Sequence, residues 1–350
     1  MKILYLAHPE QDFLCYMTFN GLCEALGEDN IVLYPFKLSY MGSSLGYSDF
    51  AYMLHNERKR GFTSSSSYIK PRRLRIYPFE EIVEEMNKID LIILSSPRHY
   101  PVHALRFIKR FYGEIPKPLI FIDGEDSENL RDDLILEFNP QLIFKRELIH
   151  SINGVYPLPF SAIVPHLNNY EELLKTEKTL DIFALFGNTH QIRSQIIKFL
   201  LEQQLNNSYI GIDTGALSWQ DDKRFEIHPL MGYEPYLQKM ASAKINIVLR
   251  GHGRDTVRYW EAASFKTLML IKDPGIIIPH PYIDKVHCVY FENEMDLREK
   301  IDYYLSHEHE DERLTIAKNC REHTLKFHTN LARAEQLLSV VKERILTWRN

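Results

Sequence analysis

This 350-residue chain is predicted to be an α/β protein with two parallel, doubly wound sheets. Two observations favour that class. Short runs of branched apolar residues alternate with segments of helical periodicity, and no hairpin turn separates one run from the next. The length suits two ordinary domains, each with its own core. We expect the first domain at residues 1–170 and the second at 171–330, with a final helix at about 331–350.

The first half of the chain contains the apolar runs expected of one buried parallel sheet. The predicted strands are Lys2–Ala7, Ile31–Pro35, Asp90–Ser95, Pro118–Ile122, Gln141–Lys145 and Ser161–Val164. The predicted helices between them are Phe13–Leu26, Phe79–Lys88 and Ala104–Tyr112. No Gly-x-Gly-x-x-Gly motif follows the first strand, which argues against a dinucleotide-binding dehydrogenase.

A long irregular segment, from about Lys37 to Arg75, interrupts this domain. Connections of this length are usually functional or disordered. The segment is rich in tyrosine, serine and basic residues, so one hypothesis is a flap that binds an anionic acceptor through Arg72, Arg73 and Arg75. The alternative is a solvated insertion with no role in binding.

The second half begins after a charged linker, Pro165–Lys178, and repeats the same alternation. Its predicted strands are Leu180–Phe186, Tyr209–Ile212, Ile245–Leu249, Leu268–Ile271 and Val289–Phe291. Its predicted helices are Gln191–Gln203, Tyr233–Ala243, Met295–Leu305, Asp311–Phe327 and Leu331–Thr347, with a further short helix before the Leu268 strand.

The composition is that of a soluble globular protein, with 45% hydrophobic and 25% charged residues. A net charge of −5 argues against a surface dominated by contacts to nucleic-acid phosphates, although a local basic groove is compatible with it. No apolar run is long enough to span a bilayer, and Met1–Leu6 leads straight into a strand rather than a signal peptide. We therefore expect a cytoplasmic protein.

The candidate metal ligands are few. The four cysteines form no Cys-x-x-Cys pair, so we interpret them as reduced packing residues. No Asp-x-Asp pair occurs anywhere in the chain. Four histidines lie among acidic residues on polar helices and are interpreted as a solvated face: His307, His309, His323 and His328. We expect no metal site and no resident cofactor.

The most informative stretch is Ile245–Ile271, which reads as strand, polar loop, helix and strand. The loop contains two glycines that let backbone amides approach a ligand, and Asp255 or Thr256 can cap the helix that follows. Arg258 and Glu261 share one face of that helix. A guanidinium can grip phosphate oxygens, and a carboxylate one turn later can accept hydrogen bonds from ribose hydroxyls. The stretch therefore indicates a nucleoside-diphosphate site, although an exposed ion pair would show the same spacing.

Arg258-Tyr-Trp-Glu261, in this context, resembles the donor-site helix of GT-B glycosyltransferases. It is most similar to the CgeB-like and exostosin-type group and to the phage DNA β-glucosyltransferases. The resemblance covers the second half well and the first in outline. It implies two Rossmann-like domains facing each other across a cleft, with the last helix crossing back to the first domain. It also implies that Arg258 contacts the donor pyrophosphate and Glu261 the ribose.

A second strand, glycine loop and helix unit lies at Leu180–Gln203, with Gly187 in the loop and Arg193 in the first helical turn. The resemblance implies that Arg193 also contacts the pyrophosphate. A second arginine of the family, slightly earlier in this loop, is not matched, and Arg250 or Arg254 is a candidate substitute. The predicted donor-binding set is Gly187, Arg193, Arg250, Gly253, Arg254, Thr256, Arg258 and Glu261.

The candidate general base lies in the first domain. Phe121-Ile-Asp123 ends a predicted strand, and the phage enzymes resemble it there with a Phe-x-Asp whose Asp is the base. The alternative for Asp123 is a turn residue before Gly124. His8 and Asp12 follow the first strand and are rivals, because ligands of open α/β sheets bind beyond the carboxyl ends of the strands.

These observations predict transfer of a sugar from a nucleoside-diphosphate sugar, most readily a UDP-sugar, to an acceptor hydroxyl. Without Asp-x-Asp we expect no metal, and with Gly253 in place of the first Glu of a Glu-x7-Glu pattern we favour inversion. The alternatives are a hydrolysing UDP-sugar epimerase of the same fold and a non-catalytic nucleotide-binding or partner-binding member. The acceptor stays open among glycan, lipid, small molecule, protein and modified DNA.

Overall fold

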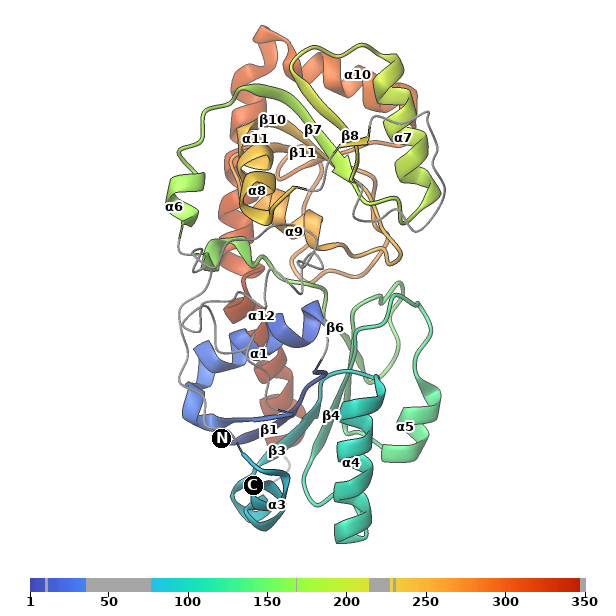
Figure 1. Cartoon of the computed structure of the whole chain (residues 1–350), viewed down its shortest axis with the longest axis vertical. Coiled ribbons are helices and arrows are strands. Elements are labelled where there is room, and N and C mark those ends of the chain that lie inside the picture. The colour runs from blue at the N-terminus through green and yellow to red at the C-terminus, as the bar shows by residue number, and fades with distance from the viewer. Residues whose placement is uncertain (10–11, 36–76, 168, 214–226, 229–230, 347–350) are drawn as a thin grey trace.

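Two α/β domains are stacked end to end in the computed structural model, which describes residues 1–9, 12–35, 77–167, 169–213, 227–228 and 231–346 (Figure 1). Each is built on a six-stranded sheet, and every strand pair in both sheets is parallel. The strand orders are β2-β1-β3-β4-β5-β6 and β12-β11-β10-β7-β8-β9. The order reverses between β1 and β3 in the first sheet and between β7 and β10 in the second. The predicted doubly wound architecture is therefore confirmed.

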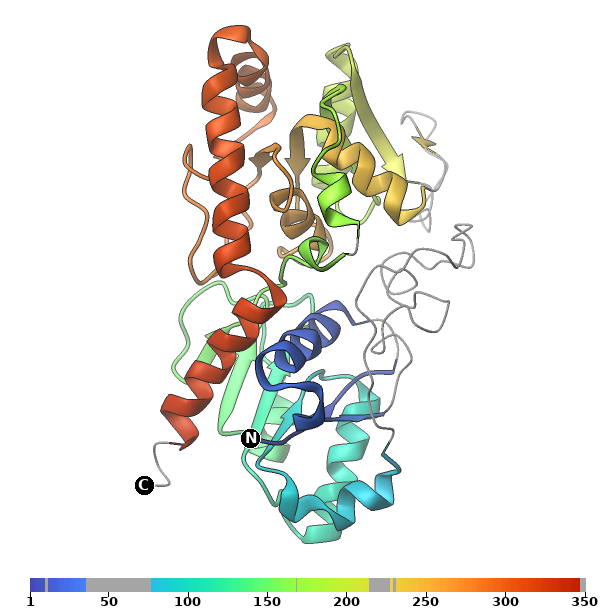
Figure 2. The same ribbon diagram turned by 90° about the vertical axis from the view of Figure 1, so that its left-hand side faces the viewer.

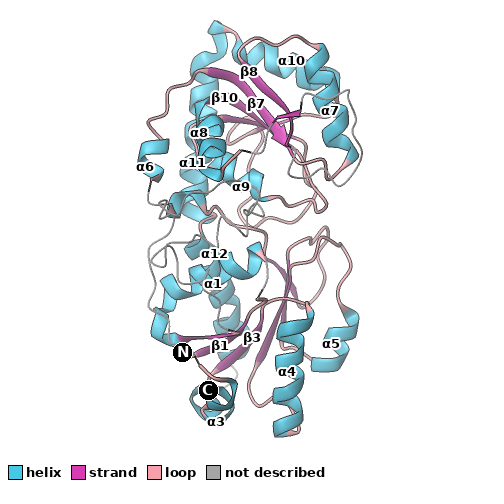
Figure 3. Cartoon of the chain, viewed as in Figure 1, coloured by secondary structure: helices cyan, strands magenta, loops and turns pink. Residues whose placement is uncertain are grey.

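The first sheet is buried on both faces, which explains its unbroken apolar runs. Its strands are β1 (Ile3–Leu6), β2 (Ile31–Tyr34), β3 (Leu91–Leu94), β4 (Leu119–Asp123), β5 (Leu142–Lys145) and β6 (Val155–Pro157). The covering helices are α1 (Phe13–Leu26), α3 (Phe79–Glu84), α4 (His99–Tyr112) and α5 (Asp132–Phe138) (Figure 3).

The second sheet contains β7 (Leu180–Phe186), β8 (Ser208–Asp213), β9 (Ile227–His228), β10 (Ala243–Val248), β11 (Leu268–Ile271) and β12 (Val289–Tyr290). Its helices are α6 (Tyr170–Leu173), α7 (Gln191–Glu202), α8 (Tyr233–Ser242), α9 (Val257–Ala263), α10 (Glu294–Leu305) and α11 (Glu310–Phe327). The chain ends in α12 (Asn330–Val341) and a π-helical turn, Lys342–Leu346.

The last helices connect the domains. In Figure 2, α11 lies along the second domain and α12 along the first, beside α1. The chain bends at His328 and Thr329, and the Thr329 hydroxyl restarts the helix by accepting a hydrogen bond from Ala332 N (3.2 Å). A Cβ built on Gly21 of α1 would lie 2.0 Å from Asn330 O. The two helices therefore touch backbone to backbone, and the predicted return of the chain to the first domain is confirmed.

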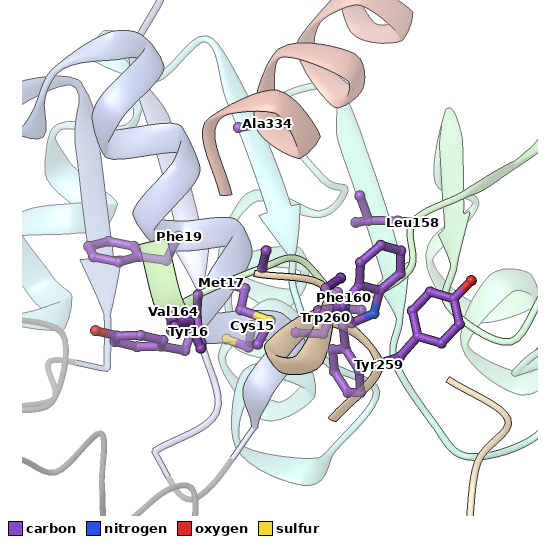
Figure 4. Packing of buried hydrophobic residues seen from close by; sticks show 14 of the residues in the cluster. Cys15, Tyr16, Met17, Phe19, Leu158, Phe160, Val164, Tyr259, Trp260 and Ala334 are labelled. Atoms are coloured by element: carbon purple, nitrogen blue, oxygen red, sulfur yellow. The ribbon is translucent and has the colours of Figure 1, made fainter. Parts of the chain in front are cut away.

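One hydrophobic cluster continues from the first domain into the second. Figure 4 shows part of it, where Tyr16 and Met17 of α1, Phe160 of the connection, and Tyr259 and Trp260 of α9 gather. Trp260 is fully buried. The donor-site helix predicted from the sequence is thus also a packing element at the junction of the two domains.

Several boundaries differ from the predictions. No strand forms at Ser161–Val164, where Ala162 makes only an isolated bridge to Thr329 of the returning chain, and the last strand of the first sheet is β6 instead. Helix α4 begins at His99 rather than Ala104, because Pro101 lies in the first turn, where its missing N–H breaks no helical bond. Helix α5 was not predicted.

All four cysteines are buried free thiols, as expected of packing residues. Within the described residues, no helix combines the length and the apolar character needed to cross a membrane.

Candidate functional site

Helix α9 begins nine residues after β10 ends, at the point where the second sheet reverses its strand order, and carries Arg258 in its first turn. The guanidinium lies over the rings of Phe186 (4.6 Å) and Tyr236 (5.2 Å), and its Nη2 donates to the Leu185 carbonyl. Its Nη1 is buried and has no hydrogen-bond partner among the described residues. A buried N–H without a partner is costly, so this atom is suited to an incoming anionic oxygen.

Glu261 follows one turn later on α9 and is only 4% exposed. Its carboxylate accepts hydrogen bonds from Tyr233 Oη (2.9 Å) and Tyr236 Oη (3.1 Å) of α8. Burial raises its pKa, while Arg258 and the two tyrosines oppose that shift. The carboxylate is therefore already held by hydroxyl donors, which is the type of partner that a ribose diol offers.

Arg193, on α7, is 8% exposed and joins two loops. After β7, it donates to Gly187 O (3.1 Å) and Thr189 Oγ1 (2.9 Å). After β10, it donates to Arg250 O (2.7 Å) and Leu249 O (3.3 Å). Burial lowers its pKa to about 9. The N–H groups of Arg193 therefore bond mainly to oxygens of the protein itself, and Arg193 holds together the two loops at the β7–β10 switch point.

The other residues predicted to bind the sugar donor lie in different places. Arg250 stays near the switch point, donates to His252 O (3.1 Å), and keeps a buried Nε without a partner among the described atoms. Arg254 instead pairs with Glu128 of the first domain (2.6 Å). Thr256 occupies the N-cap position of α9 but makes no capping hydrogen bond through its side chain.

Asp255 does not cap α9 with its carboxylate either, which corrects the sequence expectation. One oxygen accepts from Phe160 N (2.6 Å), and the other accepts from Trp260 Nε1 (2.8 Å). Burial raises its pKa to about 6. Gly253 packs against side chains of the first domain, so residues 253–255 form a contact between domains.

In the first domain, Asp123 lies at the carboxyl end of β4, as predicted, but is fully buried. It is 3.0 Å from the equally buried Lys145 Nζ at the end of β5, and it accepts a hydrogen bond from Glu125 N (3.2 Å). Burial raises its pKa, and the Lys145 charge opposes the shift. An acceptor hydroxyl can reach this carboxylate only if the enclosing loop moves.

His8 follows β1 at the switch point of the first sheet and lines a surface pocket of about 410 Å³. Its ring contacts those of His99 (6.0 Å) and Tyr100 (5.9 Å). The other pocket residues come from the ends of β3 and β4 and from α4 and α5: Pro97, Arg98, Val102, Arg106, Glu125, Arg131, Asp133 and Leu134. Asp12, by contrast, caps α1 by accepting from Cys15 N (3.0 Å).

The predicted acceptor residues Arg72, Arg73 and Arg75 lie outside the described residues. In the part of the chain that is described, no cluster of three His, Cys, Asp or Glu side chains could hold a metal ion. One of the four histidines expected on a solvated face does not lie on the surface. His328 is fully buried against Trp260 and Tyr282, because the chain crosses between domains at this point.

Residues 183–339 match the family model described as "Glycosyl transferase-like", a range that contains α7, α9 and both switch-point loops. The structure of Anabaena HepE in complex with UDP aligns with this chain with a TM-score of 0.60 at 10% sequence identity. The alignment covers 98% of this chain and 100% of HepE. T4 phage BGT in complex with UDP and Mn²⁺ aligns with a TM-score of 0.50 at 13% identity, over 99% of both chains.

The chain has the GT-B fold. A third structure of this kind, an α-glucosyltransferase in complex with UDP-glucose and DNA containing an abasic site, has a TM-score of 0.60 at 10% identity, over 97% of this chain and 98% of its own. No curated protein matches this GT-B chain in sequence. At these identities the solved structures establish the fold, and the site's chemistry must come from its own residues.

Sequence reasoning missed the residues that hold the predicted ones in place. Tyr233 and Tyr236 are three residues apart on one face of α8, a spacing that could have indicated a shared partner. Lys145 ends the strand next to β4, and a lysine at the end of an apolar strand is a signal for a buried counter-charge.

Proposed function

We propose that this protein is a glycosyltransferase that moves a sugar from a UDP-sugar to an acceptor hydroxyl. The observation that carries the proposal is the pair on α9. Arg258 has a buried Nη1 that finds no hydrogen-bond partner among the described residues, and Glu261, one turn later, is held by two tyrosine hydroxyls. The pair lies at the topological switch point of a parallel sheet, where α/β proteins bind ligands.

In this proposal the donor diphosphate binds against Arg258, with Arg250 Nε as a second buried donor on the neighbouring loop. Positive groups fixed in a low-dielectric site stabilise the charge that develops on the leaving diphosphate. Glu261 accepts the ribose hydroxyls in exchange for one or both tyrosines. The UDP complex of HepE and the UDP-glucose complex of the α-glucosyltransferase support uridine as the nucleoside of the donor.

The acceptor hydroxyl loses its proton to a base on the first domain, and the geometry supports His8 best. His8 is itself only 1% exposed, but it lines the pocket of about 410 Å³ at the β1–β3 switch point, whereas Asp123 is fully buried against Lys145 and Asp12 caps a helix. Asp123 stays a candidate that requires its loop to open.

We further propose that transfer proceeds with inversion and without a bound metal. The chain has no Asp-x-Asp pair, Gly253 stands where a Glu-x7-Glu pattern ending at Glu261 would have its first Glu, and arginines are available for the diphosphate. The Mn²⁺ in the T4 phage BGT complex makes metal a necessary test. The pocket beside His8 suits a polar acceptor, and we keep glycan, lipid, small molecule, protein and modified DNA as acceptor classes.

The decisive experiment combines donor binding with turnover. A panel of nucleotide sugars tested by thermal shift should select UDP-sugars, and UDP release should then require one of the acceptor classes. Activity should persist in excess EDTA. Complete loss that only Mn²⁺ or Mg²⁺ restores would contradict the metal-free mechanism.

Two outcomes would favour other functions of the same fold. Free sugar or an epimerised sugar released with water alone would identify a hydrolysing epimerase. UDP binding with no turnover on any acceptor would identify a nucleotide-binding member without catalysis. We also propose a cytoplasmic location, because all four cysteines are free thiols.

A further inference from the structure

Glu147, two residues beyond β5 in the first domain, is 1% exposed and holds the start of the donor helix of the second domain. Its Oε2 accepts a hydrogen bond from Arg254 N (2.8 Å), and its Oε1 accepts one from Asp255 N (3.2 Å). These amides immediately precede α9. A side chain of one domain therefore fixes the backbone that leads into the helix carrying Arg258 and Glu261.

Arg146 completes the contact from the same turn and is 3% exposed. Its Nη1 donates to Asp255 O (3.2 Å), its Nη2 pairs with Asp126, and its guanidinium lies 4.4 Å from the Phe160 ring centre. Nη2 is also 3.4 Å from Glu147 Oε1, so the buried carboxylate has a charge partner as well as two amide donors.

Gly253 makes this approach possible. A Cβ at this position would lie 2.5 Å from Glu147 Oε1 and 2.6 Å from Asp126 Oδ1. Any side chain here would push the two domains apart or displace the carboxylate.

The same edge of the first sheet also carries the buried Asp123–Lys145 pair. Asp123 is opposite Lys145 in the register of β4 and β5, and Arg146 and Glu147 follow Lys145 directly. The end of β5, which leads to the contact with α9, therefore lies beside the end of β4, which bears one of the candidate bases. A rigid link of this kind sets the distance from donor to acceptor, and reacting groups must be aligned closely for transfer.

We propose that Glu147 is a positioning residue that fixes α9 relative to the first domain, so that the donor and the acceptor groups meet in reactive alignment. The kinetic part of this proposal rests on the proposed function. The mechanical part, a fixed spacing of the two domains, does not.

The test compares Glu147→Ala, Glu147→Gln and Glu128→Gln. The amide oxygen introduced by Glu147→Gln still accepts a backbone hydrogen bond, whereas the alanine side chain cannot. Glu128 is the control, because it lies at the same junction but is 44% exposed and binds only the Arg254 side chain there. Arg146 keeps Asp126 as a counter-charge in each variant, which favours folding.

Domain spacing is measured first, without reference to activity. Spin labels on cysteines replacing the exposed Leu136 (84%) and Met295 (66%) report the distance between domains, since the native cysteines are buried. We expect a broadened distance distribution for Glu147→Ala and a near-native one for Glu147→Gln and Glu128→Gln. A narrow, native distribution in Glu147→Ala would overturn the proposal whatever the enzyme does.

Kinetics then separate positioning from donor binding. For Glu147→Ala we expect kcat to fall about 10- to 100-fold while UDP affinity by calorimetry stays near native, with partial recovery in Glu147→Gln. A loss of UDP affinity as large as the loss of kcat/KM would instead make Glu147 part of the donor site. If Glu147→Ala does not fold, Gly253→Ala tests the same contact from the second domain. Failure of all transfer in the native protein would sink the proposed function but leave the spacing result standing.

Discussion

Arg193 and Arg258 lie in the first turns of α7 and α9 in the second domain, but the N–H groups of their guanidinium ions are used differently. Arg193 ties four oxygens of two loops together, whereas Arg258 keeps a buried N–H unused. Arg258→Ala should therefore weaken UDP binding by roughly 1.5–3 kcal/mol, the range of a charge-assisted hydrogen bond, with little change in Tm. Arg193→Ala should lower both Tm and affinity, because it leaves buried carbonyls unpaired.

Calorimetry and thermal melts distinguish these outcomes. Arg298→Ala is a matched control, since that arginine forms an ordinary surface pair with Asp302 on α10. Native UDP affinity in Arg258→Ala would remove Arg258 from the donor site.

The two candidate bases, His8 and Asp123, can be distinguished by how their substitution affects kcat and the stability of the protein. His8→Ala should lower kcat by about 10²–10⁴, the value of a positioned base. Asp123→Asn leaves Lys145 charged and buried without its partner, which costs about 3–5 kcal/mol of stability. The double variant Asp123→Asn with Lys145→Met removes both charges and should recover much of that loss. If the double variant is stable yet inactive while His8→Ala turns over normally, the base is Asp123.

At the scale of elements, the crossing of α1 and α12 depends on Gly21. Alanine stabilises a helix by about 1 kcal/mol relative to glycine, so helix propensity alone would make Gly21→Ala more stable than the native protein. A loss of stability would therefore indicate a steric clash. Because the alanine Cβ would lie 2.0 Å from Asn330 O, we expect Gly21→Ala to destabilise the protein by about 2 kcal/mol or more. Ser339→Ala, at an exposed position of α12, should change urea stability little. Equal stability of Gly21→Ala and wild type would contradict the observed crossing.

Lys178, just before β7, gives the second domain a pH-dependent stability. Lys178 is partly buried, and its ammonium donates to Ala241 O at the end of α8 (2.6 Å). Burial, with Arg313 and Lys266 nearby, lowers its pKa from 10.5 to about 7. The unfolded chain therefore binds the proton more tightly, and the stability contributed by this group rises with pH between about 7 and 10.

Lys178→Met removes this titration. The difference in Tm between wild type and Lys178→Met should shift in favour of wild type as pH increases from 7 toward 10. A difference that is flat across this range would mean that Lys178 keeps its ordinary pKa in the folded protein.

Most strands and the long helices were predictable because each carries its own signal. β3 is a continuous apolar run, β7 is apolar and buried from Ile182 to Phe186, and α1 has an Asp12 cap and is followed by Gly27. The failures fall where distant segments decide the local structure. Ser161–Val164 is apolar enough for a strand, but its neighbour is the returning chain at Thr329 rather than another strand of the sheet.

The site was predictable to the same extent. The spacing of Arg258 and Glu261 on one helix is local, so sequence reasoning placed them together. The role of Arg193 as a link between loops could not be seen, because its partners at Gly187 and Leu249 come together only when β7 and β10 pair. For the same reason sequence reasoning missed Lys145, which pairs with Asp123 from the next strand, and the first-domain loops that pack against Gly253.

At the scale of the whole molecule, the two domains are not independent bodies on a linker. One hydrophobic cluster and the contact around Glu147 both run through the junction, and α12 completes the packing of a domain whose sheet ended at Pro157. We therefore expect a single cooperative unfolding transition rather than two, to be checked by comparing tryptophan fluorescence with far-UV circular dichroism in urea. Separate midpoints would show that the domains unfold independently.

The return of α12 also sets the order in which the protein can be completed during synthesis. The first domain leaves the ribosome early, with the groove beside Gly21 on α1 exposed and its apolar neighbours unpaired. Among the described residues, the atoms nearest a Cβ at Gly21 belong to Asn330 and Ala334 of α12. The first domain to be made is consequently the last to be finished, and we expect its surface beside α1 to stay exposed until α12 has been made. Nascent chains stalled before α12 should be protease-sensitive at α1, and chains stalled well beyond Val341 should be resistant.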